Sequence, residues 1–481
     1  MIYMKKNFLL GLYLILIFFP RLLFAQKENQ QPNIIFLLAD DLGYGDIGVN
    51  GQKVIKTPNI NRLALEGKSF TQFYAGCTVS APSRSSLLTG LHTGHTYIRG
   101  NKGIDPEGQE PLTDSIVTIA ELLKQAGYQT AAFGKWGLGP VGSEGDPNKH
   151  GFDIFFGYNC QTQAHRYYPD HLWDNGRKVI LEENQHLQKN KRYSPDIIHQ
   201  QALEFIEKSD SKTPFFLFLP YTLPHAELVV PDDSIFQYYK GKFPEKPFFG
   251  ADYGPNASVG GYASQAYPHA TYAAMVTRLD VYLGQILAKL KEKGLDENTL
   301  IIFTSDNGPH HEGGGDPAFF NSNGGFRGIK RDLYEGGVRM PFIARWTGHI
   351  QADTKSNFMG AFWDILPTFV TLAKGEMPKN LDGISLVPVL TDKGKQQTHD
   401  FLYWEFHENG GLQAVRQGNW KIVHLNAGKK QGSTYELYDL SKDPSEKSNV
   451  AAQHPDIVKK LSDIMAKEHI RSSLFPFAFE K

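Results

Sequence analysis

The hydrophobic positions of the chain form short uninterrupted runs, and several of these runs end abruptly in polar residues. Residues 33–38 read Asn-Ile-Ile-Phe-Leu-Leu, and residues 300–303 read Leu-Ile-Ile-Phe. A continuous apolar run of this length is typical of a strand that is buried on both faces of a sheet. Similar runs predict further strands at residues 130–133, 215–219 and 341–344.

Helical patterns lie between these predicted strands. Residues 57–67 begin with Thr-Pro and end in Gly, which combines an N-cap, a proline in the first turn and a C-terminal glycine. Residues 115–126 predict a second helix, and residues 272–293 give the longest amphipathic pattern, which Gly294 ends. The alternation of strands and helices predicts an α/β fold with a mostly parallel sheet.

Polar side chains follow the predicted strands. In a parallel sheet, ligands bind beyond the carboxyl ends of the strands, so residues at these positions are candidates for a common site. Six polar residues fall there, namely Asp40, Asp41, Lys135, His225, Asp306 and Asn307. The sequence therefore predicts a functional site at one edge of the sheet.

The pattern changes after about residue 391. Short strands with turn signals between them are expected at residues 401–406, 413–415, 420–423 and 435–438. Apolar residues at helical spacing then predict one final helix through Ile457, Val458, Leu461, Ile464 and Met465. We therefore expect a large domain over residues 26–395 and a C-terminal subdomain over residues 396–481, built from a small antiparallel sheet and a helix.

The first 25 residues have the pattern of a signal peptide. Lys5 and Lys6 precede an apolar run at residues 8–19, and Ala25 is a plausible last residue before cleavage. The run is short for a membrane span and is followed by Pro20 and Arg21, so no stable membrane anchor is expected. These features predict a secreted or periplasmic protein.

Composition narrows the function classes further. The formal net charge is −1 with 21% charged residues, which argues against a nucleic-acid-binding surface. Only two cysteines exist, Cys77 and Cys160, and the sequence leaves open whether they pair or remain free thiols.

The most specific motif is Ser80-Ala-Pro-Ser-Arg84, continued by Ser-Ser-Leu-Leu-Thr-Gly90. It resembles the signature of the type I sulfatases in the alkaline phosphatase superfamily. In that family the first residue is oxidised to formylglycine, and the motif requires Pro two residues later and Arg four residues later. Ser80 meets both requirements. Cys77 does not, because Val79 and Ala81 stand at the corresponding positions.

The resemblance extends over residues 31–470 and implies an alkaline-phosphatase-like sandwich, with the large sheet between helices. It also implies a metal site formed by Asp40, Asp41, Asp306, Asn307 and the product of Ser80. Such an all-oxygen ligand set suits a hard cation, with Ca²⁺ expected ahead of Mg²⁺ and far ahead of Zn²⁺. Conversion of Ser80 requires a formylglycine-generating maturation enzyme as a partner.

The same resemblance assigns roles in binding and cleaving the sulfate ester. Arg84 is expected to hold the hydrated formylglycine, and Lys135 and Lys330 to bind sulfate oxygens. A helix that starts near Ser85 would add its positive end. His225 is the expected proton donor to the leaving oxygen.

One position departs from the family pattern. Many relatives carry His where this chain has Gly137. His310 or His311 is a candidate to replace that histidine or to bind substrate, and simple exposure to solvent is the alternative.

The expected substrate is a sulfated glycan, cleaved from its end, with the galactose or N-acetylgalactosamine configuration favoured. Residues 158–173 are rich in aromatic and charged side chains, a composition suited to sugar rings, although such a loop could equally be packed against the sheet. The resemblance to carbohydrate sulfatases of glycan-degrading bacteria supports the glycan. The expected substrate-binding residues are His165, His171, His310 and Arg327.

Two other functions fit parts of the pattern. A phosphomonoester or phosphodiester hydrolase of the same superfamily would use unmodified Ser80 as the nucleophile. Such enzymes usually hold two zinc ions through several histidines, and that ligand set is not visible in the sequence. A non-catalytic glycan-binding homologue would keep the pocket and lack turnover.

Overall fold

The computed structural model describes residues 31–480, except residues 106, 185, 186, 188, 189, 256 and 430. The predicted signal peptide, residues 1–25, lies outside the described residues. Within the described part of the chain, no helix is long and apolar enough to cross a membrane.

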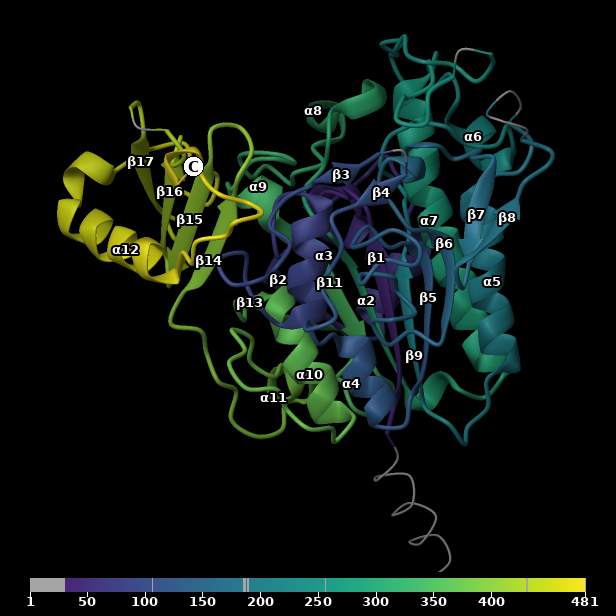
Figure 1. Ribbon diagram of the computed structural model, residues 1–481, viewed down its shortest axis with the longest axis horizontal. Helices are drawn as coiled ribbons and strands as arrows, with labels where there is room; N and C mark the ends of the chain where they lie inside the picture. The colour runs from purple at the N-terminus through teal and green to yellow at the C-terminus, as the bar shows by residue number, and fades with distance from the viewer. Residues whose placement is uncertain are drawn as a thin grey trace, which may run out of the picture.

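A sheet of eleven strands forms the centre of the molecule (Figure 1). Its five middle strands run parallel in the order β10, β1, β9, β5 and β6. Their bounds are Thr299–Ser305, Asn33–Ala39, Phe215–Pro220, Gln129–Lys135 and Ile154–Tyr158. Because these strands are parallel, their carboxyl ends meet at one edge of the sheet.

Further strands, joined to the centre by antiparallel pairings, extend it on both sides. β11 (Arg339–Arg345) pairs antiparallel with β10 and β2 (Lys68–Tyr74), and β12 (Thr354–Ser356) and β13 (Gly360–Ala361) pair with β2. On the other side, β7 (His171–Asp174) and β8 (Arg177–Ile180) extend the sheet beyond β6. The strand predicted at residues 341–344 is therefore present, and it runs against the parallel strands.

Helices cover both faces of the sheet, as its uninterrupted apolar strands require. One face carries α2 (Pro58–Leu65), α5 (Ser194–Lys208) and α7 (Pro268–Glu292), and the other carries α3 (Ser80–Thr89), α4 (Ile119–Gln125) and α10 (Ile365–Leu372). Shorter helices are α6 (Ser234–Tyr239), α8 (Pro317–Phe320), α9 (Glu335–Val338) and α11 (Val387–Thr391).

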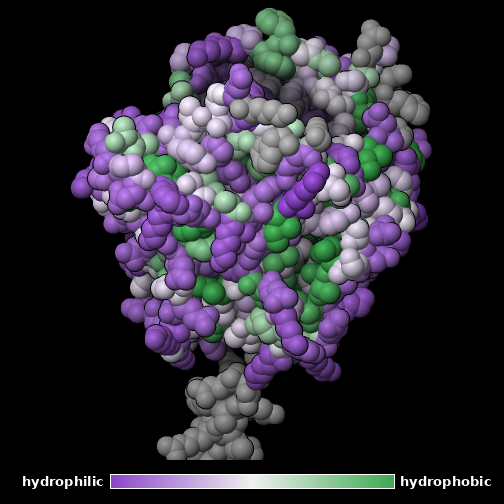
Figure 2. All heavy atoms as spheres, turned by 60° about the vertical axis from the view of Figure 1, so that its left-hand side comes forward, coloured by the Kyte–Doolittle hydropathy of each residue, from purple (hydrophilic) through white to green (hydrophobic). Residues whose placement is uncertain are grey.

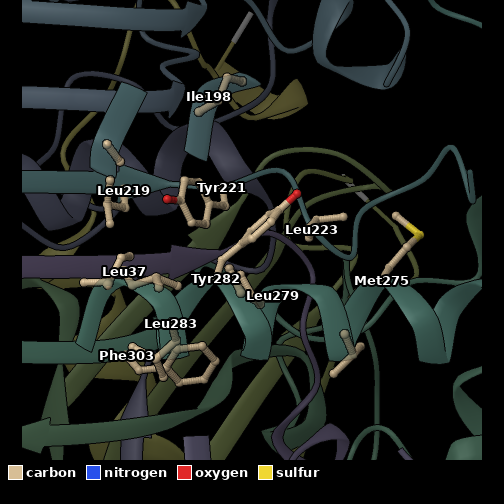
Figure 3. Packing of buried hydrophobic residues seen from close by; sticks show 14 of the residues in the cluster. Leu37, Ile198, Leu219, Tyr221, Leu223, Met275, Leu279, Tyr282, Leu283 and Phe303 are labelled. Atoms are coloured by element: carbon tan, nitrogen blue, oxygen red, sulfur yellow. The ribbon is translucent and has the colours of Figure 1, made fainter. Parts of the chain in front are cut away.

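The strands divide their side chains between two cores, as the alternation of side chains along a strand dictates. In β1, Leu37 faces the core beneath α7, whereas Phe36 faces the core beneath α3 and α10. Figure 3 shows the first of these cores, where Leu279 and Leu283 of α7 approach the strands.

A separate sheet forms the C-terminal part of the molecule (Figure 1). Its four antiparallel strands are β14 (Leu402–Phe406), β15 (Leu412–Gln417), β16 (Trp420–Leu425) and β17 (Thr434–Asp439). The helix α12 (Pro455–Glu468) packs on it through Leu461 and Met465. Figure 2 shows a largely hydrophilic surface with scattered apolar areas on the face turned toward the viewer.

The predicted fold class is confirmed: a large, mostly parallel α/β sheet and a smaller antiparallel sheet with a helix. Two details differ from the prediction. The helix expected near Ser85 begins at Ser80, and a two-stranded ribbon of β3 (Gly103–Ile104) and β4 (Gly108–Gln109) was not foreseen. Cys77 and Cys160 are both free and buried, so they form no disulfide.

A buried group of charges connects the two sheets. Lys421 of β16 is fully buried, and its Nζ lies 3.0 Å from Glu335 Oε1 and 3.1 Å from Glu446 Oε1. Glu335 begins α9, close behind the loop that contains Lys330. Removing Lys421 would leave Glu446 without this cation, whereas Glu335 would keep Arg339, whose Nη1 lies 3.2 Å from Glu335 Oε2.

We therefore predict that Lys421→Met lowers the free energy of unfolding by about 3–5 kcal/mol, because breaking a buried ion pair leaves uncompensated charge. Thermal and urea-induced unfolding of the full chain will measure the loss. Lys442→Met is the matched control, since Lys442 Nζ lies 3.1 Å from Asp439 Oδ2 and its side chain is 83% exposed. Equal unfolding midpoints for the two variants would contradict the prediction.

Candidate active site

Acidic and amide side chains converge at the carboxyl ends of two adjacent strands. Asp40 and Asp41 directly follow β1, and Asp306 and Asn307 directly follow β10. All four residues have no solvent-exposed surface. The predicted convergence is therefore present in the structure, and it places three carboxyl groups in a region shielded from water.

The backbone at Asp41 explains how two consecutive residues serve one site. Consecutive side chains of an extended strand point to opposite faces. Asp41 leaves the extended conformation with φ 62°, and its backbone N–H donates to Asp306 Oδ1 at 3.1 Å. This turn lets Asp40 contact Ser80 while Asp41 contacts Lys330 and Asn307.

Ser80 lies in the first turn of α3, beside this carboxylate cluster. Its Oγ donates to Asp40 Oδ1 at 3.0 Å and lies 3.3 Å from Lys135 Nζ. The helix begins at Ser80 rather than at residue 85, so the positive end of its dipole is at Ser80 itself. The hydroxyl is almost completely buried, with 1% of the residue exposed.

Arg84 lies one turn further along α3 and is fully buried. Its Nη2 is 3.0 Å from Asp306 Oδ2 and 3.4 Å from Asp40 Oδ2, and its Nη1 donates to the Lys135 carbonyl at 2.5 Å. Arg84 therefore links the ends of three strands, β1, β10 and β5. A buried guanidinium with this many charged and polar partners is held in one orientation.

Lys135 is the last residue of β5, and its Nζ lies 2.5 Å from Asp40 Oδ2. The neighbouring Gly134 has φ 142°, and a Cβ atom there would lie 2.1 Å from the Pro220 carbonyl oxygen. Only glycine permits this close approach of β5 to β9, which explains the glycine before the lysine.

Lys330 enters the site from the loop before α9. Its Nζ lies 2.9 Å from Asp41 Oδ2, 2.9 Å from Glu312 Oε2 and 3.1 Å from His225 Nε2. The other ring nitrogen of His225, Nδ1, donates to the Ala226 carbonyl. The Nε2 atom of His225 thus accepts a hydrogen bond from Lys330 and faces the carboxylate cluster.

The pKa values reflect this crowding of charge. Burial, together with the negative charge of Asp40, raises the pKa of Asp306 to about 7. Burial also opposes ionisation of Asp40, but the positive charges of Lys135 and Arg84 outweigh it and hold the pKa of Asp40 well below its usual range. The cluster therefore depends on nearby positive charge.

The donor set fits an oxygen-coordinated cation. Asn307 donates through Nδ2 to Asp41 Oδ1 at 2.6 Å, and its Oδ1 is buried without a hydrogen-bond partner among the described residues. An unpaired buried oxygen beside three carboxyl groups is a suitable ligand for a hard cation. Asp40, Asp41 and His225 each offer one potential ligand atom, and these three atoms lie within 4.8 Å of one another.

A pocket of about 160 Å³ opens above this centre. His165 forms part of its wall, and its ring stacks on that of His225 with centroids 5.3 Å apart. The remaining wall is formed by Asn101, Gly103, Gln109, Gln161, Thr162, His225, Tyr262, Glu312, Lys330 and Arg331.

His310 borders the centre from a buried position outside this wall. Its Nε2 lies 3.2 Å from the Pro224 carbonyl, and its Nδ1 accepts the Glu312 N–H at 3.1 Å. Both ring nitrogens therefore have backbone partners. The neighbouring His311 is exposed to solvent.

Two predicted substrate-binding residues lie away from the pocket. His171 is held between Glu107 and Asp170, with its Nε2 3.0 Å from Glu107 Oε2 and its Nδ1 2.6 Å from Asp170 Oδ1. Arg327 donates to the hydroxyl of Tyr438 at 2.7 Å, in the C-terminal sheet. Neither side chain is part of the pocket wall.

The aromatic stretch between β6 and β7 belongs mainly to the core. Tyr167 is fully buried, and its hydroxyl donates to the carbonyls of Thr222 and His225 at 2.7 and 2.8 Å. Tyr168 is 5% exposed. These rings support the segment that contains His225, and the pocket's tyrosine is Tyr262, from a different part of the chain.

The position that departs from the family pattern, Gly137, has φ 75°. A Cβ atom there would lie 3.1 Å from Gln161 Cγ, so Gln161 fills the adjacent space. Sequence reasoning did not assign Gln161, Glu312 or Arg331 to the site. Glu312 and Arg331 lie close in the sequence to residues that were assigned to the site, since Glu312 follows Asn307 by a few residues and Arg331 follows Lys330 directly. This closeness in sequence was the signal that could have identified them.

A buried serine, three carboxyl groups and three cations at one edge of an α/β sheet provide the groups that a hydrolase acting on anionic esters requires. The sulfatase family model matches residues 32–375, and a model for the C-terminal region of N-sulphoglucosamine sulphohydrolase matches residues 325–471. The chain therefore belongs to the sulfatase family and is a sulfuric ester hydrolase.

Individual relatives agree with this assignment. The chain is 31% identical to an N-acetylgalactosamine-6-O-sulfatase of Bacteroides thetaiotaomicron, over 92% of this chain and 94% of the relative. It is 32% identical to the mouse (Mus musculus) N-acetylgalactosamine-6-sulfatase, over 84% of this chain and 74% of the relative. The solved structure of Ps i-CgsB in complex with k-i-k-neocarrahexaose superimposes with a TM-score of 0.76 at 29% identity, covering 94% of this chain and 96% of that one.

Proposed function

We propose that the protein removes sulfate from the end of a sulfated glycan, using a formylglycine derived from Ser80 and a bound Ca²⁺. The observation that carries this proposal is the position of Ser80 Oγ, between Asp40 Oδ1 at 3.0 Å and Lys135 Nζ at 3.3 Å, at the positive end of α3. A nucleophile at this position would have a carboxylate nearby to accept its proton. It would also have positive charge nearby to stabilise an anionic substrate.

The formylglycine would be held by Asp40, which accepts from Ser80 Oγ, and by Arg84, which lies one helical turn from Ser80 and pairs with Asp40 at 3.4 Å. The hydrate of its aldehyde would supply the oxygen that attacks sulfur and a second hydroxyl group, whose deprotonation would provide the electron pair that expels sulfate. Lys135 and Lys330 offset the charge of the sulfate oxygens, because both are buried cations in a region that excludes water. Their positions match the requirement to neutralise an anion close to Ser80.

The leaving alcohol needs a proton as its bond to sulfur breaks. His225 Nε2 and Lys330 Nζ share a hydrogen bond of 3.1 Å, and both residues form part of the pocket wall. We assign the delivery of this proton to His225, which takes up a proton on Nε2 before passing it to the leaving oxygen. Lys330 Nζ, which donates a hydrogen bond to that atom, is the adjacent proton source.

The calcium ion would be held by Asp40, Asp41, Asp306, Asn307 and the modified Ser80. When bound, the ion would supply positive charge that favours an anionic substrate. Ca²⁺ is preferred because carboxylate and amide oxygens are its usual ligands, whereas zinc favours nitrogen and sulfur.

A glycan is the proposed substrate for two reasons. The two relatives described above are named as N-acetylgalactosamine sulfatases, and one solved relative is bound to a neocarrahexaose. The pocket volume of about 160 Å³ lies below the 300–1,000 Å³ of pockets that enclose whole drug-sized ligands. It therefore suits a sulfate group and part of one sugar, as expected for attack at a chain end. The galactose or N-acetylgalactosamine configuration is the preferred sugar.

We predict that Ser80 is modified and essential. The peptide that contains Ser80, isolated from protein made in its native host, should lack two hydrogen atoms relative to the encoded sequence, or show the corresponding hydrate. Ser80→Ala should abolish turnover and keep the thermal unfolding midpoint close to that of the parent protein. Full activity of a preparation whose Ser80 peptide is entirely unmodified would contradict the mechanism.

Chelation should remove activity, and Ca²⁺ should restore it. Ca²⁺ should also raise the thermal unfolding midpoint, because a ligand that binds only the folded state stabilises it. Asn307→Ala should weaken that thermal shift, since Asn307 Oδ1 would be lost as a ligand. Restoration by Zn²⁺ alone would favour the phosphatase-like alternative instead.

A substrate panel tests the glycan. We expect sulfated galactose or N-acetylgalactosamine saccharides to give a higher kcat/KM than an aryl sulfate, because remote sugar contacts stabilise the transition state. The panel varies the sugar and the sulfate position, with the same enzyme preparation throughout. A wide preference for the aryl ester, with no saccharide desulfated, would reject the glycan proposal and retain the sulfatase assignment.

A further inference from the structure

Two charged residues that sequence reasoning did not assign form part of the pocket wall. Glu312 is bound by two cations, with its Oε2 2.9 Å from Lys330 Nζ and its Oε1 accepting from Arg331 Nη1. The side chain of Glu312 is 15% exposed and that of Arg331 is 34% exposed. Both therefore present polar atoms to whatever occupies the pocket.

Lys330 and Arg331 are adjacent in sequence, yet they point to different places. Lys330 is directed to the buried centre, where Asp41, Glu312 and His225 take up its three hydrogen atoms. Arg331 has φ 76°, and its backbone N–H donates to the Thr78 carbonyl at 3.1 Å. This fixed left-handed turn separates the two cations, leaving Lys330 at the centre and Arg331 nearer to the opening.

The Arg331 guanidinium has capacity for further hydrogen bonds. Of its five N–H donors, the contacts among the described residues use only one, on Nη1, toward Glu312. Glu312 Oε1 and Oε2 each have one cationic partner and retain lone pairs that can accept from a hydroxyl group. A hydrogen-bond acceptor and a hydrogen-bond donor thus lie side by side.

The two cations that bind Glu312, Lys330 and Arg331, are matched by two carboxylates, Glu312 and Asp41, so the charges of this cluster cancel. Asn101, Gln109, Gln161 and Thr162 carry no charge. A second anion next to the Glu312 carboxylate would be repelled, whereas an uncharged hydroxyl can both donate to Glu312 and accept from Arg331.

We propose that Glu312 and Arg331 bind neighbouring hydroxyl groups of the sugar that carries the sulfate ester, and that Glu312 selects against a second anionic group beside that ester. This inference rests on the proposed function, whose substrate class it narrows. The favoured substrate is a monosulfated sugar with free hydroxyl groups next to the ester, rather than a sugar with sulfate on adjacent carbons.

Binding measurements separate this inference from catalysis. In full-length Ser80→Ala protein, calorimetric titrations use the best monosulfated saccharide of the panel, a version with a second sulfate on the neighbouring carbon, and inorganic sulfate. We expect Arg331→Gln to weaken binding of the monosulfated saccharide about 10–100-fold more than binding of inorganic sulfate, because a hydrogen bond to a charged group is lost only with the sugar. Glu312→Gln should reduce the ratio between the affinities for the monosulfated and the disulfated saccharide.

Arg192→Gln is the matched control, because Arg192 pairs with Glu183 at 2.9 Å on the surface and is not part of the pocket wall. It should leave all three affinities unchanged. Equal losses for saccharide and inorganic sulfate in Arg331→Gln would overturn the inference, as would tighter binding of the disulfated saccharide to the parent protein. Selective saccharide binding by an enzyme that cleaves no sulfate ester would overturn the proposed function and leave this inference standing.

Discussion

The packing of three carboxyl groups into a water-free edge of the sheet is the constraint on which the rest of the site depends. Asp40, Asp41 and Asp306 have no exposed surface, and like charges in such a place are strongly unfavourable without cations. The fold supplies those cations from three separate segments, as Arg84 on α3, Lys135 at the end of β5 and Lys330 before α9. An arrangement that stores this much positive charge around buried oxygens is also suited to bind an anion.

The C-terminal sheet contributes to this arrangement through the loop that contains Lys330. Arg327 donates to the Tyr438 hydroxyl at 2.7 Å and to the Glu446 carbonyl at 3.0 Å, and its guanidinium lies 3.8 Å from the centre of the Tyr334 ring. The Tyr334 hydroxyl, at the other end of the loop, donates to Glu436 Oε2 of β17 at 2.6 Å, so both ends of the loop are held against the C-terminal sheet. Arg327 therefore helps to position the loop that contains Lys330, although it forms no part of the pocket wall itself.

The sequence was sufficient to predict the sheet edge, because strand ends can be read from apolar runs that stop at polar residues. Asp40, Asp306 and Lys135 were found in this way, and the motif at Ser80 added α3. The loops were harder, since residue type alone does not show which way a loop side chain points. Tyr167 and His171 have suitable chemistry for a sugar, but their hydrogen bonds are used within the protein. Arg331 was missed because its side chain points away from that of Lys330 only as a result of its left-handed backbone, which residue type does not reveal.

Recognition of the ester and recognition of the sugar place opposite demands on charge. The centre must gather cations, because the sulfate is anionic at every stage of its cleavage. A pocket that was cationic throughout would hold any polyanion and would distinguish poorly between substrates, since charge attraction acts without fixed direction. Directional hydrogen bonds from neutral or mutually neutralised groups discriminate far better, because an unmatched polar group in a buried site is costly. The structure separates the two demands by depth. The cations Lys135 and Arg84, held by the buried carboxylates, lie at the centre, and the Glu312–Arg331 pair with its amide neighbours lies toward the opening.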